Sequence, residues 1–171
     1  MGRLILISGP NDSGKSRFAE SLLRDRAGDK FYIATMIPQT EDNVRRIMKH
    51  RRQREGQRFQ TLEHPGPVGG AAVTPDSAVL LEDVSNLLGN AMFTRGADEK
   101  AVFADILALS ERCALLVPVT ISGLVPDGYD GETADYIAAL NRLNERLFDV
   151  SDAAAELHAG VPVWRKGRFP G

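Results

Sequence analysis

The chain has 171 residues, of which 43% are hydrophobic and 26% are charged, and its formal net charge is -2 at pH 7. This size and composition predict one globular domain over residues 1–171, and the small net charge gives no reason to expect a nucleic-acid partner. The single cysteine, Cys113, excludes an internal disulfide and a cysteine-based zinc site. No apolar run reaches the roughly 20 residues of a membrane span, and no secretory signal is recognisable, so we expect a cytoplasmic protein without a membrane span.

Apolar strand-like runs alternate with helical patterns along the chain. Strands are predicted at Arg3–Ser8, Phe31–Thr35, Ala78–Leu81, Ala114–Thr120, Ala153–His158 and Pro162–Lys166, and helices at Lys15–Arg26, Asp42–Glu55, Ala97–Arg112 and Glu132–Phe148. The alternation predicts an α/β fold of three layers, similar to the phosphate-loop NTPases, with a mostly parallel sheet. The turn before Pro162 predicts an antiparallel edge hairpin, and the Gly- and Pro-rich stretch His64–Asp76 predicts a loop inside the domain.

A phosphate-binding loop follows the first predicted strand. The pattern G-x-x-x-x-G-K-[ST] is matched in full by Gly9, Pro10, Asn11, Asp12, Ser13, Gly14, Lys15 and Ser16. The glycines allow successive backbone N–H groups to face inward, and the next helix adds the positive end of its dipole. Lys15 can reach the β- and γ-phosphates and Ser16 can ligate Mg²⁺, so the loop predicts a nucleoside triphosphate site with Mg²⁺ as cofactor.

A second candidate feature is the pair of acids, Glu82 and Asp83, that ends the strand Ala78–Leu81. The carboxyl ends of parallel strands meet at the crevice where phosphates bind, so one acid is expected to hold Mg²⁺ or to orient a nucleophile. The spacing does not choose between the two acids, and an ordinary polar strand end is the alternative. Asn86 and Asn90 follow on a predicted helix as caps or ligand contacts.

The helical segment Asp42–Glu55 is strongly basic and carries one histidine. Its apolar residues Val44, Ile47 and Met48 are predicted to pack inward. On another face, Arg46, His50 and Arg54 follow one another at intervals of four. Neighbouring arginines favour the neutral imidazole that a nucleophile or general base requires, and they can bind phosphate oxygens. A solvated basic face is the alternative interpretation.

These motifs in this order resemble the bifunctional adenosylcobinamide kinase / adenosylcobinamide-phosphate guanylyltransferase family of cobalamin biosynthesis. The matching stretches are "LILISGPNDSGKSRFAESLL", "YIAT" at Tyr32–Thr35, "RIMKHRRQR" at Arg46–Arg54, "TLE" at Thr61–Glu63 and "AVLLEDVSNLLGN" at Ala78–Asn90. Weaker similarity is found in "GLVP", "LNERL" and "GVPVWRKG". The phosphate loop alone is shared by many families, whereas its combination with "YIAT" and the arginine- and histidine-bearing helix is specific.

The resemblance implies a trimeric enzyme that phosphorylates adenosylcobinamide with ATP or GTP and then attaches GMP from GTP to the product. It implies that His50 carries the guanylyl group, that Lys15 and Glu82 act in catalysis, and that Glu63 joins the nucleotide contacts. The region Val117–Thr133 departs from the family pattern, because it lacks an Asn-Glu pair, so the acceptor or one of the two activities could differ. The alternatives are a phosphate-loop kinase with another small-molecule acceptor and a non-catalytic GTP-binding regulatory subunit.

Overall fold

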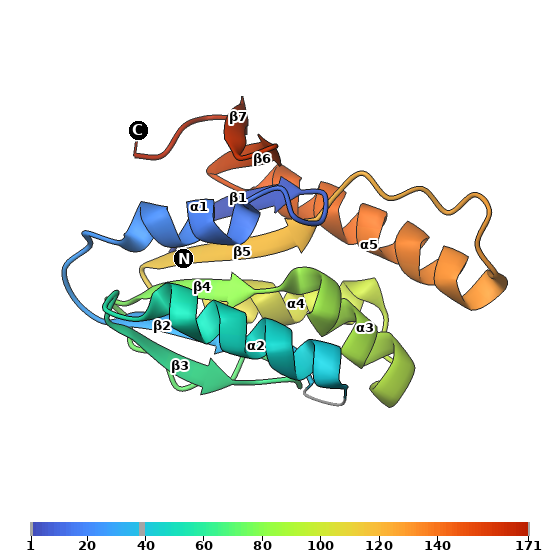
Figure 1. Ribbon diagram of the computed structural model, residues 1–171, viewed down its shortest axis with the longest axis horizontal. Coiled ribbons are helices and arrows are strands. Elements are labelled where there is room, and N and C mark those ends of the chain that lie inside the picture. The colour runs from blue at the N-terminus through green and yellow to red at the C-terminus, as the bar shows by residue number, and fades with distance from the viewer. Residues whose placement is uncertain (1, 38–39, 171) are drawn as a thin grey trace.

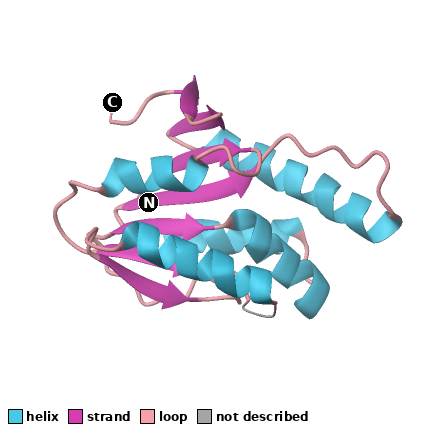
Figure 2. Ribbon diagram, viewed as in Figure 1, coloured by secondary structure: helices cyan, strands magenta, loops and turns pink. Residues whose placement is uncertain are grey.

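The computed structural model describes residues 2–37 and 40–170, which form a seven-stranded sheet covered by five helices (Figures 1 and 2). The strands are β1 (Arg3–Gly9), β2 (Lys30–Ala34), β3 (Phe59–Glu63), β4 (Ala78–Glu82), β5 (Leu115–Ile121), β6 (Ala153–His158) and β7 (Val161–Lys166). The helices are α1 (Lys15–Leu23), α2 (Glu41–Arg54), α3 (Val84–Arg95), α4 (Glu99–Ser110) and α5 (Gly131–Val150).

The sheet has the strand order β3-β2-β4-β5-β1-β6-β7. Every neighbouring pair is parallel except β6 and β7, which form the predicted antiparallel hairpin at one edge. The parallel register aligns Ala34 with Glu82 and Glu82 with Val119, so the carboxyl ends of β2, β4 and β5 lie at one edge of the sheet. The phosphate loop leaves β1 at this same edge, because β1 is parallel to β5.

Two apolar cores, one on each face of the sheet, make the predicted three-layer arrangement. The core that contains Ile5, Ile7 and Leu80 packs against α1, whereas the core that contains Leu4 and Leu81 packs against α3, α4 and α5. Successive residues of a strand point to opposite faces, so strands that are buried on both faces, such as β1 over Leu4–Ile7, supply apolar side chains to both cores. Figure 1 shows α1 and α2 in front of the sheet, with α4 behind it.

The sequence prediction missed one strand. The edge strand β3 has mostly half-exposed or exposed residues, so it lacks the continuous apolar run by which the buried strands were recognised. The predicted loop His64–Asp76 is confirmed, and the carboxylate of Asp105 fixes it by accepting hydrogen bonds from the N–H groups of Val68 and Gly69 at 2.7 Å each. Cys113 is buried in the core, as expected.

Candidate active site

The phosphate loop occupies the turn between β1 and α1. Gly14 has a φ of 87°, a backbone conformation that L-residues with side chains rarely adopt. A Cβ atom at Gly9 would lie 2.5 Å from the Ser13 hydroxyl and 3.1 Å from the Leu157 carbonyl, so the close packing of the loop requires glycine there. Lys15 Nζ donates to the Pro10 carbonyl at 3.2 Å, which holds the ammonium group against the loop.

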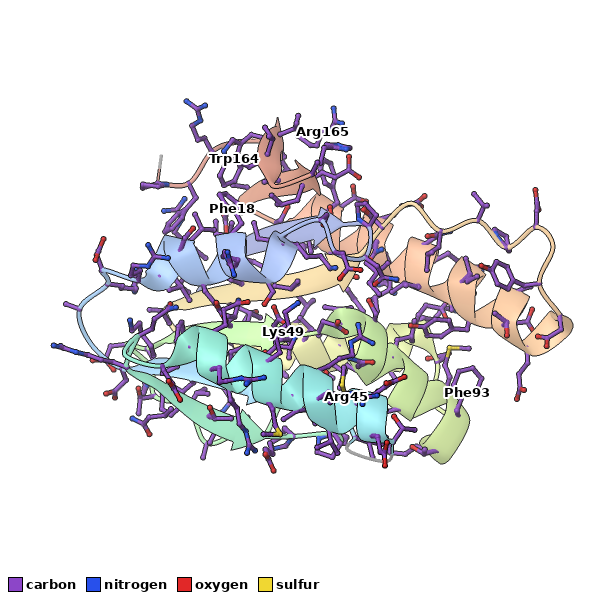
Figure 3. The ribbon with its side chains drawn as sticks, viewed as in Figure 1. Phe18, Arg45, Lys49, Phe93, Trp164 and Arg165 are labelled. Atoms are coloured by element: carbon purple, nitrogen blue, oxygen red, sulfur yellow. The ribbon has the colours of Figure 1, made fainter. Side chains whose placement is uncertain are left out.

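The turn between β6 and β7 supports the loop from behind. The N–H of Gly160 donates to the Ser13 carbonyl at 2.8 Å, and a Cβ atom at Gly14 would lie 3.4 Å from Gly160 Cα. Phe18 of α1 also packs edge-on against Trp164 of β7, with ring centroids 6.1 Å apart (Figure 3). The C-terminal hairpin therefore contacts both the phosphate loop and the helix that follows it.

The two acids at the end of β4 have different roles in the structure. The Asp83 carboxylate accepts a hydrogen bond from the Asn86 N–H at 2.7 Å through Oδ1 and caps α3, and the residue also lines the cavity described below. The Glu82 carboxylate instead lies beside the phosphate loop. Its Oε2 atom accepts a hydrogen bond from the Tyr32 hydroxyl at 3.3 Å, and its buried Oε1 atom has no hydrogen-bond partner among the described residues. Burial raises the pKa of Glu82 to about 7, against the opposing effect of the nearby Ser16 hydroxyl.

His50 projects from α2 onto the start of α1. Its Nδ1 atom lies 3.3 Å from Ser16 Oγ and 3.9 Å from Glu82 Oε2. Burial lowers the pKa of His50 to about 4, and the nearby charges of Arg54 and Arg46 add to this effect. The imidazole is therefore neutral at physiological pH, as expected from the sequence.

The face of α2 that meets the sheet is polar. The guanidinium of Arg54 lies 3.4 Å from the centre of the Tyr32 ring and donates through Nη2 to Thr61 Oγ1 at 3.3 Å. Gln53 Nε2 donates to Glu20 Oε2 of α1 at 2.6 Å. Because Arg54 and Gln53 take the contacts with the sheet and with α1, the apolar residues of this helix are displaced from the interior.

The predicted inward packing of the apolar face of α2 is therefore wrong for two of its three residues. Val44 is 41% exposed and Met48 is 51% exposed, while Ile47 is half-buried. The amphipathic pattern failed here because Arg54 and Gln53 bind an aromatic ring and polar side chains of β2, β3 and α1, and the apolar residues of α2 have no apolar sheet surface to cover.

A cavity of about 1010 Å³ opens between the phosphate loop, α1 and α2. Most of the predicted site residues line it: Asn11, Asp12, Ser13, Gly14, Lys15, Ser16, Arg46, His50, Arg54, Glu63, Glu82 and Asp83. Gly9 and Pro10 are not among the lining residues, and Glu63 is engaged in an ion pair with Arg51. The lining also includes apolar residues that were not predicted as site residues, among them Met36, Val44, Ile47, Met48 and Pro65.

The oxygen atoms at the loop fit a magnesium ion. Ser16 Oγ and the unpartnered Glu82 Oε1 are the hard oxygen ligands that Mg²⁺ prefers, and Mg²⁺ takes its remaining ligands from phosphates and water. No group of three or more His, Cys, Asp or Glu residues that could hold a metal occurs within residues 2–37 and 40–170. Such a sparse set suits an ion that enters with the nucleotide and not one held by the protein alone.

Tyr32, Gln53 and Gly160 are site residues to which the sequence analysis assigned no role, although all three lie in stretches that resemble the family. All three line the cavity, and the N–H of Gly160 also donates to the Ser13 carbonyl of the loop. From the sequence alone, Tyr32 is indistinguishable from an ordinary buried strand residue. The register between β2 and β4 is what brings its hydroxyl to Glu82. The turn at Gly160 was predicted, but its contact with the phosphate loop depends on the tertiary position of the hairpin.

Comparison with known proteins identifies the family. The model of the cobinamide kinase / cobinamide phosphate guanyltransferase family matches residues 5–164. The chain belongs to this family. It is 34% identical to the bifunctional adenosylcobalamin biosynthesis protein CobU of Escherichia coli and 31% identical to that of Salmonella typhimurium, in each case over 94% of this chain and 98% of the relative. The resemblance noted from the motifs is confirmed, and the protein is an enzyme of the kinase and guanylyltransferase class.

Solved structures of two secretion ATPases also align with the chain. A type III secretion system ATPase gives a TM-score of 0.47 at 10% identity, covering 99% of this chain and 60% of that chain. The VirB11 ATPase of the Brucella suis type IV secretion system gives a TM-score of 0.47 at 16% identity, and the alignment covers 96% of this chain and 47% of that chain.

Most of the Val117–Thr133 segment that departs from the family pattern lies away from the cavity, although Val119 of β5 is among the lining residues. Residues 122–130 form the loop between β5 and α5, and among the described residues this loop is not part of the cavity lining. Asn141 Nδ2 fixes the loop by donating to the Leu124 carbonyl at 3.1 Å, while Val125 and Tyr129 are exposed. Within the described part of the chain, no helix is long and apolar enough to cross a membrane.

Proposed function

We propose that this protein phosphorylates the hydroxyl group of adenosylcobinamide with ATP or GTP, and then transfers GMP from GTP to the resulting phosphate through a guanylylated His50. The observation that carries the proposal is the position of His50: a neutral imidazole whose Nδ1 lies 3.3 Å from Ser16 Oγ of the phosphate loop. A side-chain nucleophile beside a triphosphate-binding loop supports a covalent protein–nucleotide intermediate, which neither a plain kinase nor a regulatory subunit requires.

The nucleotide is held by the loop at Gly9–Ser16 and by the basic residues of α2. The backbone N–H groups at the start of α1 bind phosphate oxygens, and Lys15 offsets their charge. Arg46 lines the same cavity and can donate paired hydrogen bonds to phosphate. Mg²⁺ held by Ser16 and Glu82 would supply further neutralisation of phosphate charge.

In the guanylyl step the imidazole of His50 acts as the nucleophile. With Nδ1 carrying the hydrogen and donating toward Ser16 or Glu82, Nε2 keeps its lone pair. Nε2 attacks the α-phosphorus of GTP, an N–P bond forms, and the bond to the β-phosphate oxygen breaks, so that pyrophosphate leaves with the electron pair. A phosphate oxygen of adenosylcobinamide phosphate then attacks the same phosphorus, the N–P bond breaks, and neutral His50 is restored.

In the kinase step the protein acts mainly by positioning charge. The hydroxyl oxygen of adenosylcobinamide attacks the γ-phosphorus, and the bond from that phosphorus to its bridging oxygen breaks. Lys15 and the loop amides stabilise the negative charge on the phosphoryl oxygens, and the hydroxyl proton is lost to water after the new bond has formed. His50 takes no part in this bond exchange, so the two activities are separable by substitution.

The apolar part of the cavity is the proposed site of the corrinoid acceptor. The cavity volume of about 1010 Å³ lies at the upper end of the range for small-molecule sites, so it can hold a nucleotide and part of a second substrate. Val44 and Met48 expose apolar surface at this cavity, and a large ring substrate can cover it. The trimer implied by family resemblance stays a prediction, to be tested by sedimentation against the 18.6 kDa mass of one chain.

Labelled GTP tests the proposed function directly. We expect α-³²P-GTP to leave an acid-labile, base-stable GMP adduct on the protein, and we expect no adduct in His50→Ala. The same variant is expected to retain phosphorylation of adenosylcobinamide. His158→Ala is the matched control, because His158 lies on β6 and pairs with Glu156 outside the cavity.

Three outcomes would contradict the proposal in different ways. An adduct that persists in His50→Ala would move the covalent step to another residue. Kinase turnover without an adduct in the wild-type protein would favour the small-molecule kinase. GTP binding without turnover of any corrinoid would favour the regulatory subunit.

A further inference from the structure

Tyr32 lies at the centre of the contacts that join the acid at the end of β4 to the helix that carries His50. It is 3% exposed, so its hydroxyl must find a partner within the protein. The hydroxyl donates to Glu82 Oε2 at 3.3 Å, and this same oxygen lies 3.9 Å from His50 Nδ1. The bond occupies one carboxylate oxygen and leaves Oε1 as the unpartnered one.

The ring of Tyr32 makes a second contact, with α2. The guanidinium of Arg54 lies 3.4 Å from the ring centre, in a site where Arg54 is 7% exposed. Arg54 is one turn after His50 on the same helix, so this contact fixes the end of α2 nearest to the imidazole. The Phe59 ring of β3 packs edge-on against Tyr32, with centroids 6.4 Å apart, which keeps the Tyr32 ring in place.

We propose that Tyr32 is a positioning residue for both partial reactions: its hydroxyl orients the Glu82 carboxylate and its ring sets the place of α2 through Arg54. The inference rests on the proposed function and adds to it a residue that contacts neither substrate in the mechanism above. The two contacts are separable, because phenylalanine removes the hydroxyl alone, whereas leucine removes the hydroxyl and the ring.

Steady-state and single-turnover kinetics of Tyr32→Phe test the hydroxyl. We expect kcat of both reactions to fall about 10- to 100-fold, as for loss of one hydrogen bond to a charged group, with the nucleotide KM changed less than about 2-fold. In a Glu82→Gln background the same substitution is expected to change kcat less than about 2-fold, because the group that it orients is already altered. Tyr32→Leu is expected to slow formation of the GMP adduct by a further factor of about 10.

Tyr136→Phe is the matched control, since it also removes a partly buried hydroxyl hydrogen bond, from Tyr136 to the Ser85 carbonyl at 2.8 Å, and Tyr136 lies outside the cavity lining. Equal kinetics for Tyr32→Phe and Tyr136→Phe would overturn the proposal. An undiminished effect of Tyr32→Phe in the Glu82→Gln background would also overturn it.

A urea-unfolding cycle of the nucleotide-free protein in EDTA gives a readout that does not depend on activity. We expect the effects of Tyr32→Phe and Glu82→Gln on the unfolding equilibrium to be non-additive, and additive effects would contradict the contact. If the wild-type protein shows neither corrinoid phosphorylation nor a GMP adduct, the proposed function fails, while the unfolding cycle still tests the link between Tyr32 and Glu82.

Discussion

Helices α1 and α2 lie on the same face of the sheet and line the same cavity, but different kinds of interaction hold them against the rest of the protein. α1 buries Ala19 and Leu23 in the apolar core. Arg54 is the buried residue of α2, all 14 residues of which the structure describes, and the apolar Val44 and Met48 are exposed. One helix is held by apolar burial and the other by hydrogen bonds and a cation–π contact.

This difference separates stability from chemistry within one site. Apolar burial contributes more to folding than exposed or compensated polar contacts do, so α1 is a fixed part of the fold that carries the phosphate loop. The polar face of α2 instead sets the charge and orientation around His50. We therefore expect substitutions in α1 to act on the free energy of unfolding, and substitutions in α2 to act on catalysis.

The largest effect on stability is expected at Leu23, which is fully buried. Leu23→Ala should lower the free energy of unfolding by about 2–5 kcal/mol, because it removes apolar contacts and leaves a cavity. Urea denaturation measures the loss, and kcat at a temperature where the variant is folded should stay near that of the wild type. A loss of stability below about 1 kcal/mol would contradict the claim that apolar burial holds α1 in place.

Lys15 is the exception within α1, because it belongs to the phosphate loop. Lys15→Ala should reduce both activities by at least about 10²- to 10³-fold, the loss typical of removing one group that stabilises transition-state charge. The unfolding midpoint should change little, since Lys15 contacts only the Pro10 carbonyl at 3.2 Å among the bonds that the structure shows for its ammonium group. Retained kinase turnover would count against the phosphate-loop assignment.

The pH dependence of stability in the metal-free protein should show two opposite contributions from the site. The pKa of His50 falls from 6.5 to about 4 on folding, so the unfolded state binds more protons between these values and stability falls as pH is lowered through them. The pKa of Glu82 rises from 4.5 to about 7, so the folded state binds more protons and stability falls as pH is raised from 4.5 to 7.

Substitutions separate these two contributions. His50→Ala should remove the loss of stability toward pH 4, and Glu82→Gln should remove the loss toward pH 7, as measured by urea unfolding across pH in EDTA. Slopes identical to those of the wild type in both variants would show that these groups do not titrate as the site geometry implies.

The smallest effect on stability is expected at Met48. Met48→Ser should change the free energy of unfolding by less than about 0.5 kcal/mol, because the side chain is half exposed. If the acceptor binds at the proposed site, Met48→Ser should also raise the KM for adenosylcobinamide, while the KM for GTP stays the same. Phe93→Ser is the control, since Phe93 is also about half exposed but lies on α3, outside the cavity lining (Figure 3). An equal effect of both substitutions on the corrinoid KM would argue against that site.

Sequence patterns were sufficient where a motif is local. The phosphate loop, the acid that ends β4 and the histidine among arginines are each defined by residues close in the chain, and most of these residues meet at one cavity. Patterns failed at α2, whose orientation is set by Tyr32, Thr61 and Glu20 on three other elements. The sequence left the choice between Glu82 and Asp83 open; in the structure Asp83 caps α3, and the Glu82 carboxylate accepts a hydrogen bond from Tyr32, a residue far away in the chain.

The most direct test of the account is a crystal structure with Mg²⁺ and a GTP analogue that cannot be cleaved between the α- and β-phosphates. We predict that the β- and γ-phosphates lie in the loop Gly9–Ser16 and that a ring nitrogen of His50 lies about 3–3.5 Å from the α-phosphorus, in line with the bond to be broken. An empty loop, or a His50 ring that stays bonded to Ser16 with no nitrogen facing the nucleotide, would contradict the account.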